Sequence, residues 1–306
     1  MKEAFQKALK DSLKVSWMLI QVYIPLSLLT IFLKQIGFID FIAPFFAPMM
    51  RLIGLPGETA ITLIAGFTNN IYAALGTMAA FDLTPRQVTI LGIVIGISHN
   101  LIVETGVLIK LKMANFRIAF FRIAVGLITG VLINLILPQN IKGVRLSPYY
   151  KANDFSWLKS FQKIGITCLQ IVVIIFLIML MYELVMLWKH KGVIKQKFKP
   201  ISKIIGFSDS AFVPWIIAFI VGIAYSAGIL FQLTKNQKLN HRDVCLITTF
   251  LCVAHAAVED TMLFGLLGGN LIWIIATKAI VAFTITRIFA TRDIYKKFLW
   301  IGLRKE

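Results

Sequence analysis

Long apolar runs, separated by short polar connectors, make up most of this sequence. Their approximate bounds are 15–34, 58–80, 87–110 and 116–137 in the first half and 164–188, 211–233, 243–266 and 270–290 in the second. A helix needs roughly 20 apolar residues to cross the hydrocarbon core of a bilayer. We therefore predict an all-α, polytopic integral membrane protein with about 8–10 transmembrane helices.

Two shorter segments do not fit this pattern of full crossings. The apolar segment 38–54 is shorter than the roughly 20 residues of a full crossing and carries Pro44 and Pro48, which predicts a re-entrant or interfacial helix. Segment 192–206 carries four lysines, which favours a helix along the membrane surface.

A hydrophilic stretch, PQNIKGVRLSPYYKANDFSW, divides the chain near its middle. The predicted parts are a first membrane repeat over 1–137, a connector over 138–159 and a second membrane repeat over 160–306. The halves resemble each other at a constant separation of 156 residues, and rare polar types recur in register. The clearest pairs are Phe5-Gln6-Lys7 with Phe161-Gln162-Lys163, Gly66 with Gly222, Arg86 with Arg242, Val88 with Val244, His99 with His255, Glu104 with Asp260, Thr105 with Thr261 and Arg122 with Lys278.

Duplicated halves with a site at their junction are a common plan of transporters. Four crossings in each half would make the repeats parallel, whereas an odd number would invert them. The basic connector 189–203 favours inversion, but a cytoplasmic N-terminus with parallel repeats places more Lys and Arg inside. The sequence leaves both arrangements open.

The composition supports a membrane protein and excludes other classes. The 306 residues are 58% hydrophobic and only 15% charged, against about a quarter charged in soluble domains. The formal net charge of +18 comes from Lys and Arg in connectors and at the ends, where such charges normally anchor spans against anionic headgroups; we therefore expect the lipid bilayer and no nucleic acid as a partner. Three cysteines in or beside apolar runs predict no disulfide framework.

Polar groups lie in the middle of several predicted spans, where a charge costs several kcal/mol unless it is paired, hydrated or neutralised. On a continuous helix, Asn100 and Glu104 share a face, as do His255 and Glu259. His99 and Glu104 are five apart, about 140° around a regular helix. They can converge only if the helix breaks or if two helices each supply one group.

Three chemistries remain open for these groups, besides structural hydrogen bonds between helices. Thiol, imidazole and carboxylate together suit a divalent transition metal, with candidate ligands His99, Glu104, Cys252, His255, Glu259 and Asp260. Amides and acids could instead bind a polar solute, with candidate residues Asn69, Asn70, His99, Asn100, Glu104, His255, Glu259 and Asp260. Acids and histidines could also relay protons.

The pattern of residues 58–137 resembles a known family. It combines a span with small residues and amides (Gly66 to Gly76), a turn at DLTPRQV and the segment GISHNLIVETGVLIK. It is similar to the Gate, or nucleoside-recognition, domain, with a weaker second copy over 211–290. Such domains occur in spore-maturation membrane proteins, and related gates occur in Feo-type ferrous-iron permeases and concentrative nucleoside transporters. The resemblance implies a membrane carrier or gate for iron(II) or for nucleosides.

Three functions follow as hypotheses. The first is a secondary carrier for a divalent transition metal such as iron(II), the second a carrier for nucleosides or other small polar solutes, and the third a non-transporting scaffold of the spore-maturation type. We expect no enzyme, because the sequence has no glycine-rich phosphate loop, GxSxG elbow or CxxC pair. We expect no cofactor other than a divalent metal ion as cargo. We expect the protein to lie in a bacterial inner membrane, and we leave open whether it forms a homo-oligomer.

Overall fold

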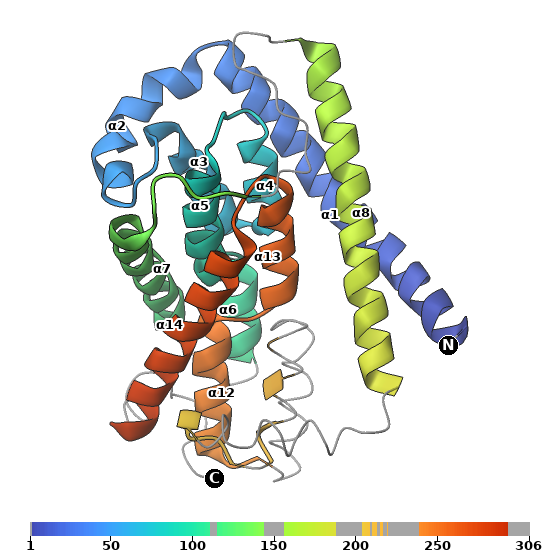
Figure 1. Cartoon of the computed structure of the whole chain (residues 1–306), viewed down its shortest axis with the longest axis vertical. Helices are drawn as coiled ribbons and strands as arrows, with labels where there is room; N and C mark the ends of the chain where they lie inside the picture. The colour runs from blue at the N-terminus through green and yellow to red at the C-terminus, as the bar shows by residue number, and fades with distance from the viewer. Residues whose placement is uncertain are drawn as a thin grey trace.

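The computed structural model describes residues 2–110, 115–143, 156–187 and 239–292, together with short pieces between 204 and 219. This described part of the chain is helical and contains no strand (Figure 1). Its helices are α1 (Lys2–Gln35), α2 (Phe38–Leu52), η1 (Gly57–Thr59), α3 (Ala60–Thr68), α4 (Ile71–Met78), α5 (Pro85–Ser98), α6 (Leu101–Lys110), α7 (Arg117–Ile136), α8 (Trp157–Leu187), α12 (His241–Val253), α13 (Ala257–Leu266) and α14 (Leu271–Thr291).

The fold class predicted from the sequence is confirmed. Six spans in the described residues are long and apolar enough to cross a membrane, or seven if the bent pair of α2 with Gly57–Thr68 counts as one. The predicted span 211–233 lies largely outside the described residues, as do segment 144–155 of the connector and most of the basic segment 192–206.

The proline-rich segment after α1 forms the short helix α2, which turns by 90° into the following helical segment. Lys34, at the end of α1, secures this corner through ion pairs with Asp40 at 2.6 Å and Glu58 at 2.8 Å. The α2 side chains Phe41 and Phe45 are highly exposed. A short, bent helix with an outward aromatic face agrees with the predicted re-entrant or interfacial element.

Three of the predicted spans are not single helices. Span 58–80 divides into α3 and α4 at Asn69–Asn70, span 87–110 into α5 and α6 at His99–Asn100, and span 243–266 into α12 and α13 at 254–256. Asn100 and Ala256 have positive φ angles of 53° and 45°, which end the preceding helices. The two breaks with positive φ are themselves 156 residues apart, so the repeat seen in the sequence recurs in the backbone.

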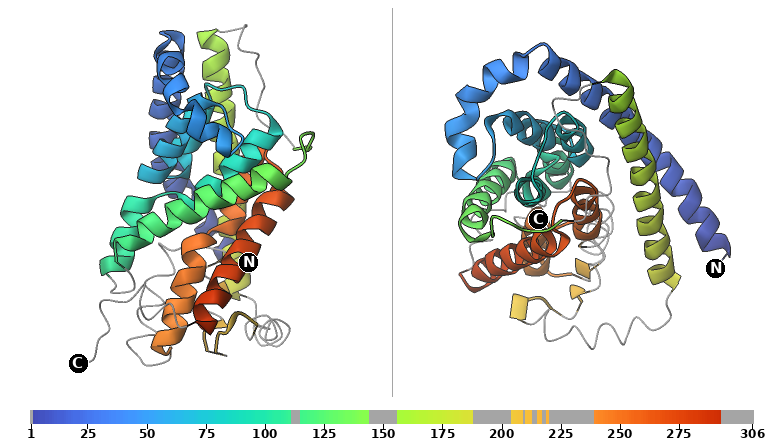
Figure 2. Two further views of the ribbon diagram at one scale, coloured as in Figure 1. Left: turned by 90° about the vertical axis from the view of Figure 1, so that its left-hand side faces the viewer. Right: turned by 45° about the horizontal axis from the view of Figure 1, so that its top comes forward.

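Central helices from the two halves run in opposite directions. Asn270, just before α14, donates its backbone N–H to Thr89 Oγ1 near the start of α5 at 2.9 Å. His99, which follows the end of α5, contacts His255, which precedes α13. Helix α13 is therefore antiparallel to α5, as Figures 1 and 2 show.

The long helices α1 and α8 lie side by side and are also antiparallel. Lys7, near the start of α1, pairs with Glu183, near the end of α8, at 2.7 Å. These opposed directions support inverted rather than parallel repeats. The division into repeats over 1–137 and 160–306 stays a prediction.

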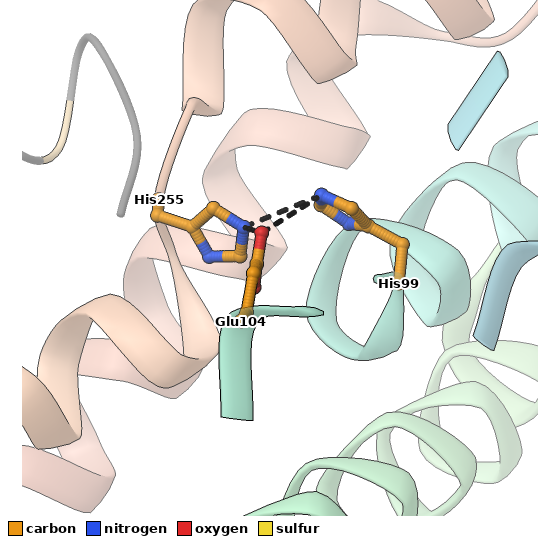
Figure 3. Close-up of side chains that lie close together, drawn as sticks. All are labelled: His99, Glu104 and His255. Carbon is orange, nitrogen blue, oxygen red and sulfur yellow. Dashed lines mark hydrogen bonds and ion pairs between the residues drawn. The ribbon is translucent and has the colours of Figure 1, made fainter. Parts of the chain in front are cut away.

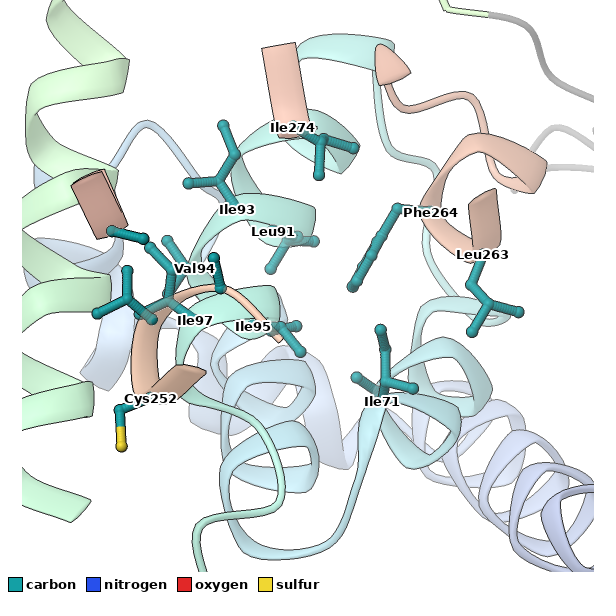
Figure 4. Packing of buried hydrophobic residues seen from close by; sticks show 14 of the residues in the cluster. Ile71, Leu91, Ile93, Val94, Ile95, Ile97, Cys252, Leu263, Phe264 and Ile274 are labelled. Carbon is teal, nitrogen blue, oxygen red and sulfur yellow. The ribbon is translucent and has the colours of Figure 1, made fainter. Parts of the chain in front are cut away.

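The two broken spans α5–α6 and α12–α13 form the centre of the molecule. Most of their residues are buried, whereas only about a third of each of the other four candidate spans is buried. Figure 4 shows the apolar packing around them, where Ile71, Leu91 and Phe264 meet side chains from both halves. Polar groups placed at the breaks are therefore enclosed by apolar side chains.

A glycine at a tight turn provides the first testable prediction. Gly54 has a φ of 73°, and a Cβ at this position would collide with the side chain of Asn134. We expect Gly54→Ala to lower the free energy of unfolding by about 1–3 kcal/mol, through backbone strain and the clash. Gly106→Ala is the matched control, since a Cβ there meets no atom within 4 Å. Thermal unfolding in detergent measures both; equal melting temperatures for the two variants would contradict the prediction.

Candidate functional site

Three side chains from the two halves meet where the central helices break: His99, Glu104 and His255, hereafter the His–Glu–His cluster (Figure 3). His255 Nε2 lies 3.1 Å from Glu104 Oε1 and 3.3 Å from His99 Nε2, and His99 Nε2 lies 3.8 Å from Glu104 Oε1. All three side chains are buried. Within the described part of the chain, this is the one group of three His, Cys, Asp or Glu residues whose ligand atoms lie within 4.8 Å of one another.

The helix breaks orient both histidines in the same way. His99 Nδ1 lies 3.0 Å from the carbonyl oxygen of Ile95, and His255 Nδ1 lies 2.7 Å from that of Leu251. A carbonyl only accepts hydrogen bonds, so we infer that each Nδ1 carries the proton and donates it. Each Nε2 then presents a lone pair to the centre of the cluster.

Arg122 on α7 holds the first break together. It has no exposed surface, and its Nη1 lies 2.7 Å from Glu104 Oε2. Its other donors bond the carbonyl oxygens of Ile97 at 3.0 Å and His99 at 2.9 Å. A single guanidinium thus pairs the buried acid and satisfies carbonyls that the interrupted helix leaves without partners.

Lys278 on α14 plays the matching part in the second half. Its Nζ lies 2.6 Å from Asp260 Oδ2 and 3.4 Å from the carbonyl oxygen of His255. Both side chains are buried. The pairs Arg122–Glu104 and Lys278–Asp260 balance two positive charges against two negative charges inside the membrane region.

The remaining predicted acid, Glu259, has a different partner. Its Oε1 accepts a hydrogen bond of 2.6 Å from the hydroxyl of Tyr72 on α4. His255 and Glu259 do not lie on one continuous helix, because His255 precedes the turn at Ala256. Asn100 lies directly before α6, and its carbonyl accepts a helical bond from the backbone N–H of Glu104.

The other predicted site residues are not members of the cluster. Asn69 is exposed at the end of α3, and the side chain of Asn70 caps α4 by accepting from the backbone N–H of Ala73 at 2.9 Å. Asn100 adopts the left-handed conformation and donates its backbone N–H to the carbonyl of Gly66. Cys252 is buried in apolar packing (Figure 4). Cys252, Glu259 and Asp260, which the sequence indicated as further metal ligands, lie outside the His–Glu–His cluster.

Three residues of the site were not among the sequence candidates: Arg122, Lys278 and Tyr72. The first two left a signal, because they match each other between the halves and lie in the middle of apolar spans. An acid and a base at corresponding positions in both halves predict a buried pair in each. Tyr72 left no comparable signal.

Comparison with known proteins supports the family resemblance. A family model described as Gate, nucleoside recognition, matches residues 16–115. The resemblance to the Gate family is confirmed. The Gate match extends from within α1 to just beyond α6 and includes His99 and Glu104, whereas the sequence pattern placed the Gate-like core at 58–137.

A curated relative is also a membrane protein. The uncharacterized membrane protein YvoD of Bacillus subtilis (strain 168) is 28% identical over 277 residues, which cover 88% of each chain. No solved structure matches the chain significantly. Together with the apolar helices, these two matches identify an integral membrane protein. In general terms, they support a membrane transporter or scaffold.

Proposed function

We propose that this protein is a secondary carrier for a divalent transition-metal ion such as iron(II), bound as cargo by His99, Glu104 and His255. The observation that carries the proposal is the set of three buried donor atoms, two Nε2 and one carboxylate oxygen, at mutual distances of 3.1, 3.3 and 3.8 Å. Imidazole and carboxylate are donors that such ions accept.

The spacing of these atoms fits a common ion. Ligand atoms about 2.0–2.2 Å from a tetrahedral ion lie roughly 3.3–3.6 Å from one another. Two imidazole lone pairs and a carboxylate oxygen repel one another unless a cation or a proton lies between them. Three protein ligands also leave a fourth position open for water, which suits a site that must exchange its ion.

The surrounding charges support transport over permanent binding. Arg122 already neutralises Glu104, so the two histidines and one acid offer a divalent ion little net negative charge. A carrier needs a site that binds strongly enough to load and weakly enough to release. The position of the site at broken helices between two oppositely directed halves also follows the plan of many secondary transporters. We infer that an ion gradient or a partner protein drives transport, in a bacterial inner membrane.

Metal binding to the purified protein tests this proposal. We expect iron(II), manganese(II) or zinc(II) to raise the melting temperature of the wild type, since a ligand at about 100 times its Kd adds about 2.7 kcal/mol of stability. His255→Ala should lose this stabilisation. Glu183→Gln is the control, because Glu183 pairs with Lys7 at the end of α8. An equal metal-induced shift in His255→Ala and wild type would refute the site.

A nucleoside or similar polar solute is the second candidate, and the Gate match favours it. Asn69 is exposed beside the α3–α4 break and could bond a base edge or hydroxyl. The side-chain amide of Asn70 caps α4, and Asn100 forms the turn before α6. Thermal stabilisation by nucleosides, with no response to metals, would favour this candidate. A response to neither class would favour the scaffold hypothesis.

A further inference from the structure

We propose that Glu259 is a proton-binding site, separate from the His–Glu–His cluster, and that its proton is the one exchanged during cation transport. The coupling to transport rests on the proposed function, whereas the proton site itself does not. The structural basis is the hydrogen bond of 2.6 Å between the Glu259 carboxyl and the Tyr72 hydroxyl.

The first argument concerns charge compensation. Glu104 has Arg122 at 2.7 Å and Asp260 has Lys278 at 2.6 Å. Within the described residues, Glu259 takes part in no ion pair with Lys, Arg or His. A carboxylate without a cation is costly at mid-membrane depth, whereas a protonated carboxyl is far less so. Of the three acids next to the breaks, Glu104, Glu259 and Asp260, Glu259 is therefore the one whose protonation sacrifices no ion pair within the described residues.

The second argument comes from the comparison of the two halves. The histidines, the two paired acids and the two buried cations recur at a separation of 156 residues. The position that corresponds to Glu259 is Val103, an exposed apolar residue of α6. Helix α6 begins after its break with no acid at position 103, so a break of this kind does not require an acid at position 259. An acid in the middle of a span that the fold does not need is costly, and we therefore infer a functional role for Glu259.

The third argument is the position of the Tyr72–Glu259 bond. Tyr72 lies in α4, directly after the α3–α4 break, and Glu259 lies in the first turn of α13, directly after the α12–α13 break. The bond therefore joins two broken spans from opposite halves. Hydrogen bonds to an ionised carboxylate are stronger than those to a neutral group. Protonation weakens the link between the halves, and ionisation strengthens it.

The neighbours of Glu259 are consistent with this exchange. Helix α13 packs against α14, α8, α5 and α4. The titratable or charged groups that face this region are Lys278 of α14, His99 at the end of α5, Tyr72 of α4, and Asp260 and His255 beside Glu259 in the chain. Helix α8 presents apolar side chains and Gln170 to α13. The negative charge of Asp260 disfavours ionisation of Glu259, and the positive charge of Lys278 favours it. Because Asp260 and Lys278 pair with each other, their charges largely cancel at Glu259.

Transport in proteoliposomes tests the coupling. We expect a pH gradient to stimulate manganese(II) uptake by the wild type and by Glu183→Gln. Glu259→Gln should bind manganese(II) with an unchanged dissociation constant but lose the stimulation by the pH gradient. Stimulation that persists in Glu259→Gln would overturn the coupling.

Infrared difference spectra between high and low pH test the proton site independently of any metal. We expect the wild type to gain the C=O band of a protonated carboxyl at low pH and Glu259→Gln to lack this band. Tyr72→Phe, which keeps the acid and removes the hydroxyl, should shift the band without abolishing it, and serves if Glu259→Gln does not fold. An identical band in wild type and Glu259→Gln would overturn the proposal. The band without any manganese binding would support the proton site and refute the metal carrier.

Discussion

Arg122→Met is expected to lower the free energy of unfolding by about 3–5 kcal/mol, the largest effect of any substitution proposed for this protein. Arg122 has no exposed surface and bonds Glu104 as well as the carbonyl oxygens of Ile97 and His99. Without it, a buried carboxylate loses its cation and the interrupted helix loses two donors. Unfolding by sodium dodecyl sulfate in mixed micelles measures the change.

A double substitution separates the charge from the carbonyl bonds. In Glu104→Gln/Arg122→Met no unpaired charge remains, so we expect the double variant to be more stable than Arg122→Met alone. The remaining deficit against wild type then reflects the carbonyl bonds to residues 97 and 99. If Arg122→Met unfolds at the same detergent fraction as wild type, the guanidinium does not stabilise the break and the assignment is wrong.

The sequence predicted the helical membrane fold because apolar runs of bilayer length are a local property. It did not predict that span 87–110 breaks: the spacing of His99 and Glu104 indicated only that they converge if the helix breaks or if two helices each supply one group. The break depends on Arg122, which supplies donors to Ile97 and His99 from the next helix. These hydrogen bonds come from another helix, so neither helix propensity nor hydropathy of span 87–110 can predict them.

The sequence predicted only part of the candidate site, because some of its contacts also depend on the tertiary structure. The repeat at 156 residues identified His99 and His255 as a pair, and the structure brings their Nε2 atoms to 3.3 Å. The repeat did not reveal whether the halves are parallel or inverted, which depends on the path of the chain. It also gave no information on Tyr72 and Glu259, which meet across 187 residues without a matched pair in the first half. Conserved spacing within a duplicated chain thus indicates partners only where both halves retain them.

Lys278→Met is the second substitution with a large expected effect, about 3 kcal/mol of lost unfolding free energy. Its Nζ bonds Asp260 at 2.6 Å, and both groups are buried. We expect a smaller loss than for Arg122→Met, because within the described residues Lys278 makes one further bond, of 3.4 Å, to the His255 carbonyl. The same unfolding measurement in mixed micelles gives the comparison.

The control is Asp260→Asn/Lys278→Met, which should recover most of the lost stability because few carbonyl bonds depend on Lys278. Lys278 also passes over Gly96 of α5, with Nζ 3.1 Å from the position of a Cβ there, so its side chain links α14 to the first half. If the double variant recovers more fully than Glu104→Gln/Arg122→Met does, the break in the second half depends less on its cation than the break in the first. The second break would then be the easier one to rearrange when the halves move, which agrees with the position of Glu259 directly after it. Equal recovery in both double variants would contradict this difference between the halves.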